Sequence, residues 1–153
     1  FNYVGNDNEY LVSRKVLPGE AKEKYRAHFD SHLFTLVLPV QIPELLHREN
    51  GELIFVPSAR RNPKMEIENI LGKIYFKKYA NKKSIDKLLA NGKAHTANFR
   101  DFKPLLFRGN TYLHTNRGLH SSSKDFRLTC LCHFFDPSGE SGLGSLIRKI
   151  RSR

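Results

Sequence analysis

An imidazole and a carboxylate, His28 and Asp30, stand two positions apart just before the apolar run LFTLVLPV at residues 33–40. In an extended chain, residues i and i+2 point to the same side, so these two side chains project together while Phe29 points away. This spacing suits a pair of metal ligands. It also suits an ordinary surface hydrogen bond, because roughly 0.3 such pairs are expected by chance at this composition. The rest of the sequence has to decide between the two interpretations.

A metal site with two histidines and one carboxylate needs a second histidine from a distant strand. His114 follows the segment PLLFRGNTYL, which we expect to contain a strand, a glycine turn and the start of another strand. His120 lies in the loop-like segment RGLHSSS, only seven residues before Arg127. We favour His114 as the third ligand because of its strand context and its longer spacing to Arg127.

Short strands separated by glycine and proline turns dominate the predicted secondary structure. The nearly continuous apolar run at residues 33–40 suits a strand covered on both faces. Other strands are expected in NYVGN and EYLVSRKVLPGE and at residues 52–57, 102–110, 111–114 and 126–135, with a short basic helix or frayed tail at 144–153. This pattern favours a sandwich or a jelly-roll barrel over a parallel α/β sheet.

Between residues 64 and 92 the period of the sequence becomes helical. Large apolar residues recur there at i, i+3, i+4, i+7 and i+8, one stripe of an amphipathic helix. The stripe consists of Ile67, Ile70, Leu71, Ile74 and Tyr75. We expect it to pack over the strands rather than to bind lipid. A second helix is expected in SIDKLLANG, with Ser84 as its N-cap and Gly92 just beyond its end.

The H-x-D pair, the distal histidine and the arginine that follows resemble the motif of the Fe(II)/2-oxoglutarate-dependent dioxygenases. The segment FRGNTYLH resembles the turn before the distal histidine of that superfamily, and TLVLPVQIP followed by GELIFVP resembles its strand pair after H-x-D. The resemblance covers residues 25–57 and 104–135. It implies a mainly β fold, a double-stranded β-helix of the jelly-roll, cupin-like type, with the helices as an insertion around residues 64–92.

By this resemblance, His28, Asp30 and His114 would hold iron, and Arg127 would bind the far carboxylate of 2-oxoglutarate. Arginine suits that role because its planar, charged fork binds a carboxylate through two hydrogen bonds. Thr129, on the same strand face, could add a hydroxyl hydrogen bond. The implied cofactors are Fe(II), 2-oxoglutarate and O2. The implied reaction is hydroxylation of a small-molecule substrate with release of succinate and CO2. An anionic substrate is one of the options.

Four further residues are candidates for substrate contacts. Ser31 and His32 directly follow the ligand pair, although a turn role fits them equally well. Arg108 is a candidate for binding an anionic group, against the alternative of a solvated side chain at a strand end. His120 is the fourth. His133, on the last predicted strand, is instead expected to be a hydrogen-bonded core histidine.

The net charge of +11 favours an anionic partner. Two alternatives to a small-molecule enzyme follow: a non-enzymatic basic β-domain that binds nucleic acid through phosphate contacts, and a dioxygenase that acts on nucleic acid. We do not favour the second, because nucleic-acid enzymes of this superfamily usually carry R-x-x-x-x-x-R. Here Arg127 is followed by LTCLCHFFDP, which contains no arginine.

Length and apolar content predict one domain over residues 1–153, either complete or a piece of a longer chain. No apolar run approaches the ~18 residues of a membrane-spanning helix, so none is expected. Cys130 and Cys132 are too close together for an ordinary disulfide and indicate buried thiols in a reducing compartment. We therefore expect a cytoplasmic protein.

Overall fold

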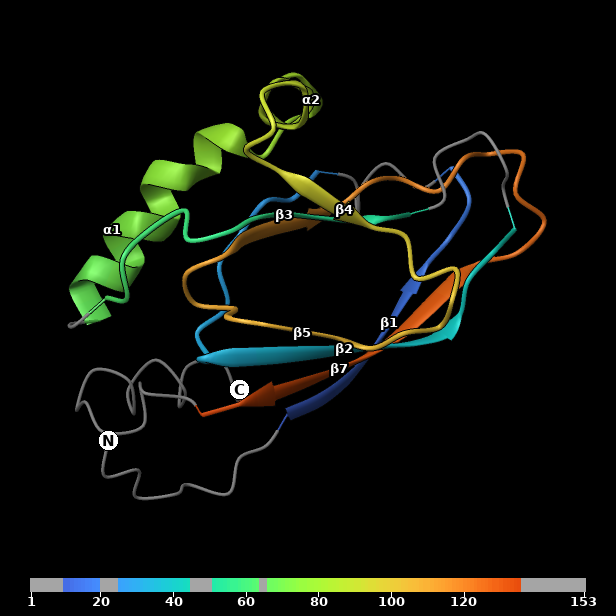
Figure 1. The fold of residues 1–153 in the computed structure, drawn as a ribbon, viewed down its shortest axis with the longest axis horizontal. Coiled ribbons are helices and arrows are strands. Elements are labelled where there is room, and N and C mark those ends of the chain that lie inside the picture. Colours follow the sequence, from blue (N-terminus) through green and yellow to red (C-terminus); the bar gives the residue numbers. More distant parts are fainter. Residues whose placement is uncertain (1–9, 20–24, 45–50, 64–65, 136–153) are drawn as a thin grey trace, which may run out of the picture.

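The computed structural model describes residues 10–19, 25–44, 51–63 and 66–135. The strand expected in NYVGN and the basic helix expected at residues 144–153 lie outside this part of the chain. Within it, the fold is mainly β, with two antiparallel sheets and two α-helices (Figure 1). The prediction of a mainly β domain with a helical segment in the middle is therefore confirmed.

The larger sheet has four strands in the order β1-β7-β2-β5. Its strands are β1 Tyr10–Val16, β2 Phe34–Gln41, β5 Leu105–Phe107 and β7 Arg127–Phe134. The smaller sheet has the order β4-β3-β6, with β3 Leu53–Val56, β4 His95–Ala97 and β6 Leu113–Asn116. All of the strand pairs are antiparallel, and most join segments far apart in the sequence. The two sheets lie one above the other in Figure 1.

The helices lie between β3 and β4, where the change of period predicted them. They are α1 Glu66–Phe76, the 3-10 turn η1 Lys77–Tyr79 and α2 Lys82–Ala90. The predicted N-cap of α2 was wrong. Asn81 caps this helix, because its side-chain oxygen accepts a hydrogen bond from the backbone N–H of Ser84 at 2.9 Å. Nowhere in the described residues is a helix long and apolar enough to cross a membrane.

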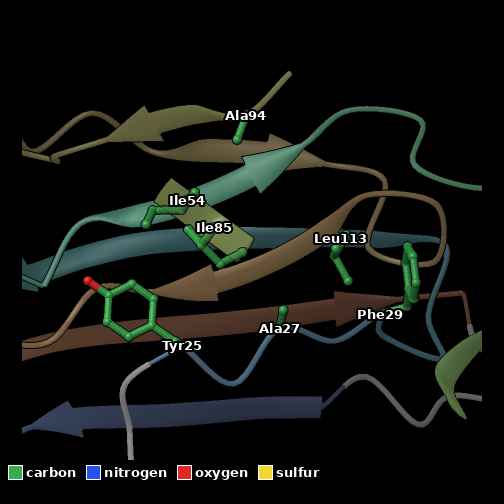
Figure 2. Packing of buried hydrophobic residues seen from close by; sticks show 7 residues of the cluster. All are labelled: Tyr25, Ala27, Phe29, Ile54, Ile85, Ala94 and Leu113. Carbon is green, nitrogen blue, oxygen red and sulfur yellow. The ribbon is translucent and has the colours of Figure 1, made fainter. Parts of the chain in front are cut away.

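Two clusters of buried apolar residues lie on opposite sides of the smaller sheet. One lies between the sheets and contains Val37, Leu53, Phe99 and Phe107. The other lies between the smaller sheet and the helices and contains Tyr25, Ala27, Phe29, Ile54, Ile85, Ala94 and Leu113 (Figure 2). Within the smaller sheet, β3 and β6 are therefore covered on both faces, whereas β4 remains largely exposed.

The strands buried on both faces are β6, in which all four residues are buried, and the first half of β3, rather than β2. Neighbouring residues Leu53 and Ile54 of β3 point to opposite faces and are 4% and 1% exposed. In β2 the burial alternates instead, with Thr35 and Val37 buried between the sheets and their neighbours partly exposed. The four-stranded sheet thus has an outer face. Because Cys130 and Cys132 point to that face, they are only partly buried.

The apolar stripe of α1 does not pack over the strands as expected. Its five residues are between 39% and 64% exposed. The helix instead contacts the domain through its opposite face, where Phe76 packs edge-on against Phe29 with ring centroids 5.0 Å apart. Asn69, on the same face, accepts hydrogen bonds from Arg60. Amphipathic spacing correctly predicted the helix but not the face that docks.

We predict that Ile85→Ala and Ile74→Ala differ sharply in their effect on stability. Ile85 is 1% exposed between α2 and the smaller sheet, whereas Ile74 of α1 is 64% exposed. The first substitution leaves a cavity and should lower the free energy of unfolding by about 2–5 kcal/mol. The second should change it by less than about 0.5 kcal/mol. Urea unfolding measures both, and equal losses would contradict the solvent-facing orientation of α1.

Candidate metal centre

His28, Asp30 and His114 converge on one point between the sheets. One ligand atom from each residue lies within 4.8 Å of the others. Asp30 Oδ1 is 3.4 Å from His114 Nε2 and 3.8 Å from His28 Nε2. Such a set of two imidazoles and one carboxylate is typical of non-haem Fe(II) sites.

Backbone pairing brings the two histidines together. His28 and His114 form an isolated antiparallel bridge in which each N–H donates to the other's carbonyl at 3.0 Å. Their rings consequently lie side by side, with centroids 4.4 Å apart. Phe29 points the opposite way into the helix-side cluster and is 2% exposed. The alternation expected from the sequence thus directs His28 and Asp30 to one side.

Hydrogen bonds determine which ring nitrogens can bind a metal. Nδ1 of His28 donates to the carbonyl of Arg26 at 2.7 Å, and Nδ1 of His114 donates to the carbonyl of Tyr112 at 3.0 Å. A carbonyl can only accept, so each Nδ1 carries the proton in the neutral ring. Nε2 faces Asp30, and it holds a lone pair when the ring is neutral and a second proton when the ring is charged. Outer hydrogen bonds of this kind orient metal-binding histidines.

The local electrostatics keep Asp30 ionised. Burial by itself raises the pKa of this carboxyl, but the charge of His114 and hydrogen bonds from His114 and Thr35 hold it well below its usual range. The pKa of His114 is raised, because the attraction of Asp30 outweighs burial. The pKa of His28 is lowered, first by burial and then by His114, although 43% of its side chain is exposed. The site therefore presents a carboxylate and the neutral imidazole of His28, and a metal ion would replace the proton that Asp30 attracts to His114.

A second layer of residues fixes the orientation of Asp30. The hydroxyl of Thr35 donates to Asp30 Oδ2 at 2.5 Å. Because that hydroxyl has a single proton, its contact with His133 Nδ1 at 3.1 Å is a bond that it accepts. His133 is thus hydrogen-bonded, as the sequence predicted. The sequence reasoning missed Thr35, whose signal is a lone hydroxyl in an apolar strand.

Gly109 leaves the space that Asp30 and Thr35 occupy. A Cβ at position 109 would lie 2.5 Å from both Asp30 Oδ2 and Thr35 Oγ1. The carbonyl of Gly109 also accepts the backbone N–H of Asp30 at 3.0 Å. Any larger residue at this position would push the carboxylate out of place.

The three residues open into a cavity between the sheets. Arg127 and Thr129 of β7 line the same cavity, so the structure brings all five predicted metal and cosubstrate residues together. The other lining residues are Arg14, Thr35, Val37, Leu53, Phe107, Thr115, Asn116, Leu131 and His133.

Arg127 is a buried cation with neutral partners. It is 2% exposed, and its Nη1 donates to the carbonyl of Gly51 and, at 3.1 Å, to Asn116 Oδ1. Gly51 has a φ of +75°, and a Cβ there would lie 3.1 Å from Arg127 Cδ. Burial, followed by the charge of Arg14, lowers the pKa of Arg127 to about 10, against an opposing effect of the charge of Glu52. Nε of Arg127 and Oγ1 of Thr129 are buried without a hydrogen-bond partner among the described residues.

The four predicted substrate residues are not among those that line the cavity. Ser31 accepts a hydrogen bond from Lys73 of α1 at 3.1 Å, and the ring of His32 stacks on His133. Arg108 is exposed at the turn before Gly109. His120 lies in the turn after β6, where its Nδ1 accepts the N–H of Ser122 at 3.2 Å. These positions lie beside the centre in sequence, but their side chains point elsewhere.

We predict that His114→Ala abolishes tight binding of a divalent metal and that His120→Ala does not. Loss of outer hydrogen bonds alone costs about 10- to 100-fold in metal affinity, so loss of a ligand should cost more than about 100-fold. Titration calorimetry with Mn²⁺ measures both variants. Retention of affinity in His114→Ala together with loss in His120→Ala would overturn the ligand assignment.

Thr35→Val should weaken Mn²⁺ binding by about 10- to 100-fold, because it removes the hydrogen bond that fixes Asp30 while keeping the shape of the side chain. Thr35→Ser retains the hydroxyl and should bind metal as the unmodified protein does. If both variants bind Mn²⁺ with unchanged affinity, Thr35 does not position the carboxylate.

Comparison with known proteins identifies no relative of this chain. No family model matches the sequence, and no curated protein or solved structure is significantly similar to it.

Proposed function

We propose that this protein is an Fe(II)- and 2-oxoglutarate-dependent dioxygenase. The observation that carries the proposal is the set of side chains that line one cavity. His28, Asp30 and His114 meet at one end of it, and Arg127 and Thr129 line its wall. A metal-binding triad and a desolvated guanidinium in the same cavity suit a ligand that chelates a metal at one end and carries a carboxylate at the other.

The donor set fits Fe(II). With both rings neutral, two imidazole nitrogens and one carboxylate would occupy one face of an octahedron and leave three positions for other ligands. Asp30 Oδ2 is taken by the Thr35 hydroxyl, so Oδ1 is the oxygen that faces both Nε2 atoms. This arrangement supports binding of the metal through one oxygen of Asp30.

The far end of the cavity fits a carboxylate. Arg127 is almost fully removed from water, and its Nε lacks a partner among the described residues. An anion would compensate this charge, and the hydroxyl of Thr129, equally without a partner, would add a hydrogen bond. Arg127 and Thr129 would therefore hold the far carboxylate of 2-oxoglutarate.

Ferrous iron and 2-oxoglutarate, when bound, supply the oxidation: one atom of O2 enters the keto acid, giving succinate and CO2, and the other enters a C–H bond of the substrate. The protein's own residues bind and orient. Nδ1 bonds to backbone carbonyls fix the two imidazoles, and the Thr35 hydroxyl fixes Asp30.

We propose further that the two sheets form a double-stranded β-helix. The antiparallel pairing of β2 with β7 and of β3 with β6, with the ligands between the sheets, supports this assignment. A cavity between two sheets that would also hold the cosubstrate favours a small molecule or a single projecting group as the substrate.

The direct test combines binding and turnover. Anaerobic addition of Fe(II) and 2-oxoglutarate to the protein should produce a weak visible absorption band, and admission of O2 should release succinate slowly even without substrate. His120→Ala serves as the matched control and should retain the band, whereas His114→Ala should lack it. Absence of both the band and succinate from the unmodified protein would refute the proposal.

Arg127→Gln should weaken 2-oxoglutarate binding by roughly 2–4 kcal/mol, about 30- to 700-fold, because a desolvated two-point contact is lost. Mn²⁺ binding should change far less, since Arg127 does not contact the triad. Arg127→Lys keeps the charge but has one contact point, so its affinity for 2-oxoglutarate should lie between those of Arg127→Gln and the unmodified protein. Calorimetry on the Mn²⁺-loaded protein measures all three. Equal loss of metal and keto acid would indicate unfolding instead.

A further inference from the structure

A second arginine, Arg14, lines the same cavity from an edge of the four-stranded sheet. Arg14 lies on β1, an edge strand that pairs with β7. In that register Arg14 is directly opposite Thr129, and Val16 is opposite Arg127. Because side chains alternate along a strand, Arg14 shares the inner face with Val16, which is 1% exposed.

Arg14 faces the same part of the cavity as Arg127 and Thr129. It lines that cavity, and the register of β1 with β7 places it level with Thr129. After the larger effect of burial, the charge of Arg14 lowers the pKa of Arg127. The two guanidinium groups therefore lie on neighbouring strands of one cavity wall.

Among the described residues that line the cavity, guanidinium groups outnumber carboxylates. The guanidinium groups are those of Arg14 and Arg127, and the carboxylate is that of Asp30, which faces the imidazoles. The charge of Glu52, which is not a lining residue, also acts on Arg127. A divalent metal at the triad would enlarge the positive excess. Electrostatics then favour a doubly charged anion over a singly charged one, and a second cation beside Thr129 strengthens that preference at the end remote from the metal.

We propose that Arg14 is a second anion-binding residue that, with Arg127 and Thr129, holds the distal carboxylate of the keto acid and selects dicarboxylates over monocarboxylates. This inference rests on the proposed function. It assigns to β1, outside the H-x-D, His and Arg motif, a role in cosubstrate selection.

The neighbouring residue provides a matched control. Lys15 follows Arg14 on the same strand, is exposed on the outer face, and has its Nζ 4.0 Å from the centroid of the Phe126 ring. Arg14→Gln and Lys15→Gln therefore remove the same formal charge from adjacent positions, one inside the cavity and one outside. Arg14→Lys retains the charge inside the cavity and serves as a second variant if Arg14→Gln does not fold.

The experiment measures the affinity of each variant for Mn²⁺, and then that of the Mn²⁺-loaded protein for 2-oxoglutarate and for pyruvate, by calorimetry. Arg14→Gln should weaken 2-oxoglutarate binding by about 10-fold or more and leave pyruvate binding unchanged, because pyruvate has no distal carboxylate. Mn²⁺ binding should be unchanged or a few-fold tighter, since a nearby positive charge is removed. Lys15→Gln should match the unmodified protein, and Arg14→Lys should lose less affinity for 2-oxoglutarate than Arg14→Gln.

Three results would overturn the inference. Unchanged 2-oxoglutarate binding in Arg14→Gln would show that Arg14 does not contact the keto acid, and the proposed function would stand. Equal weakening of 2-oxoglutarate and pyruvate would place Arg14 at the metal end. Failure of the unmodified protein to bind 2-oxoglutarate with Mn²⁺ present would remove the proposed function itself.

Discussion

A carboxylate that has lost most of its water is the constraint on which the rest of this structure depends. The side chain of Asp30 is only 10% exposed, and an uncompensated buried charge costs several kcal/mol. The chain compensates the two oxygens differently. Oδ2 accepts the Thr35 hydroxyl, whereas Oδ1 faces Nε2 of both His28 and His114. This asymmetry leaves one oxygen directed at the point where a cation would be held, so the structural solution to burial is also the geometry of the candidate metal centre.

The helical insertion supports that geometry without entering the cavity. None of the lining residues in the described part of the chain comes from residues 66–90. Phe29, between the two ligands, is instead fixed from behind by Phe76 of α1, and the guanidinium of Arg60 lies 4.0 Å from the centroid of its ring. Arg60 also donates to the carbonyl of Asn110, next to the glycine turn that contacts Asp30. The insertion therefore positions the ligand segment, and this explains why α1 docks through a polar and aromatic face.

Local patterns in the sequence predicted the parts of the site that depend on alternation. His28 and Asp30 share a side because of their spacing, and the same reasoning applies to Arg127 and Thr129 on β7. Patterns could not predict which face of an element the rest of the chain covers, since that depends on distant segments. The outward stripe of α1 and the two-sided burial of β3 therefore escaped prediction. Arg14 escaped for the same reason, because only the register between β1 and β7 brings it to the cavity.

The position of Arg127 also discriminates between the candidate functions. A domain that binds nucleic acid through phosphates needs its cations on an accessible surface, where they replace condensed counterions. Arg127 is 2% exposed and lies between two sheets, where a polymer backbone cannot reach it. The net charge of +11 would permit such binding elsewhere on the surface, but it gives no reason to bury a guanidinium beside three potential metal ligands. A small anion that enters the cavity does give a reason to bury the guanidinium, because it compensates the charge where water cannot.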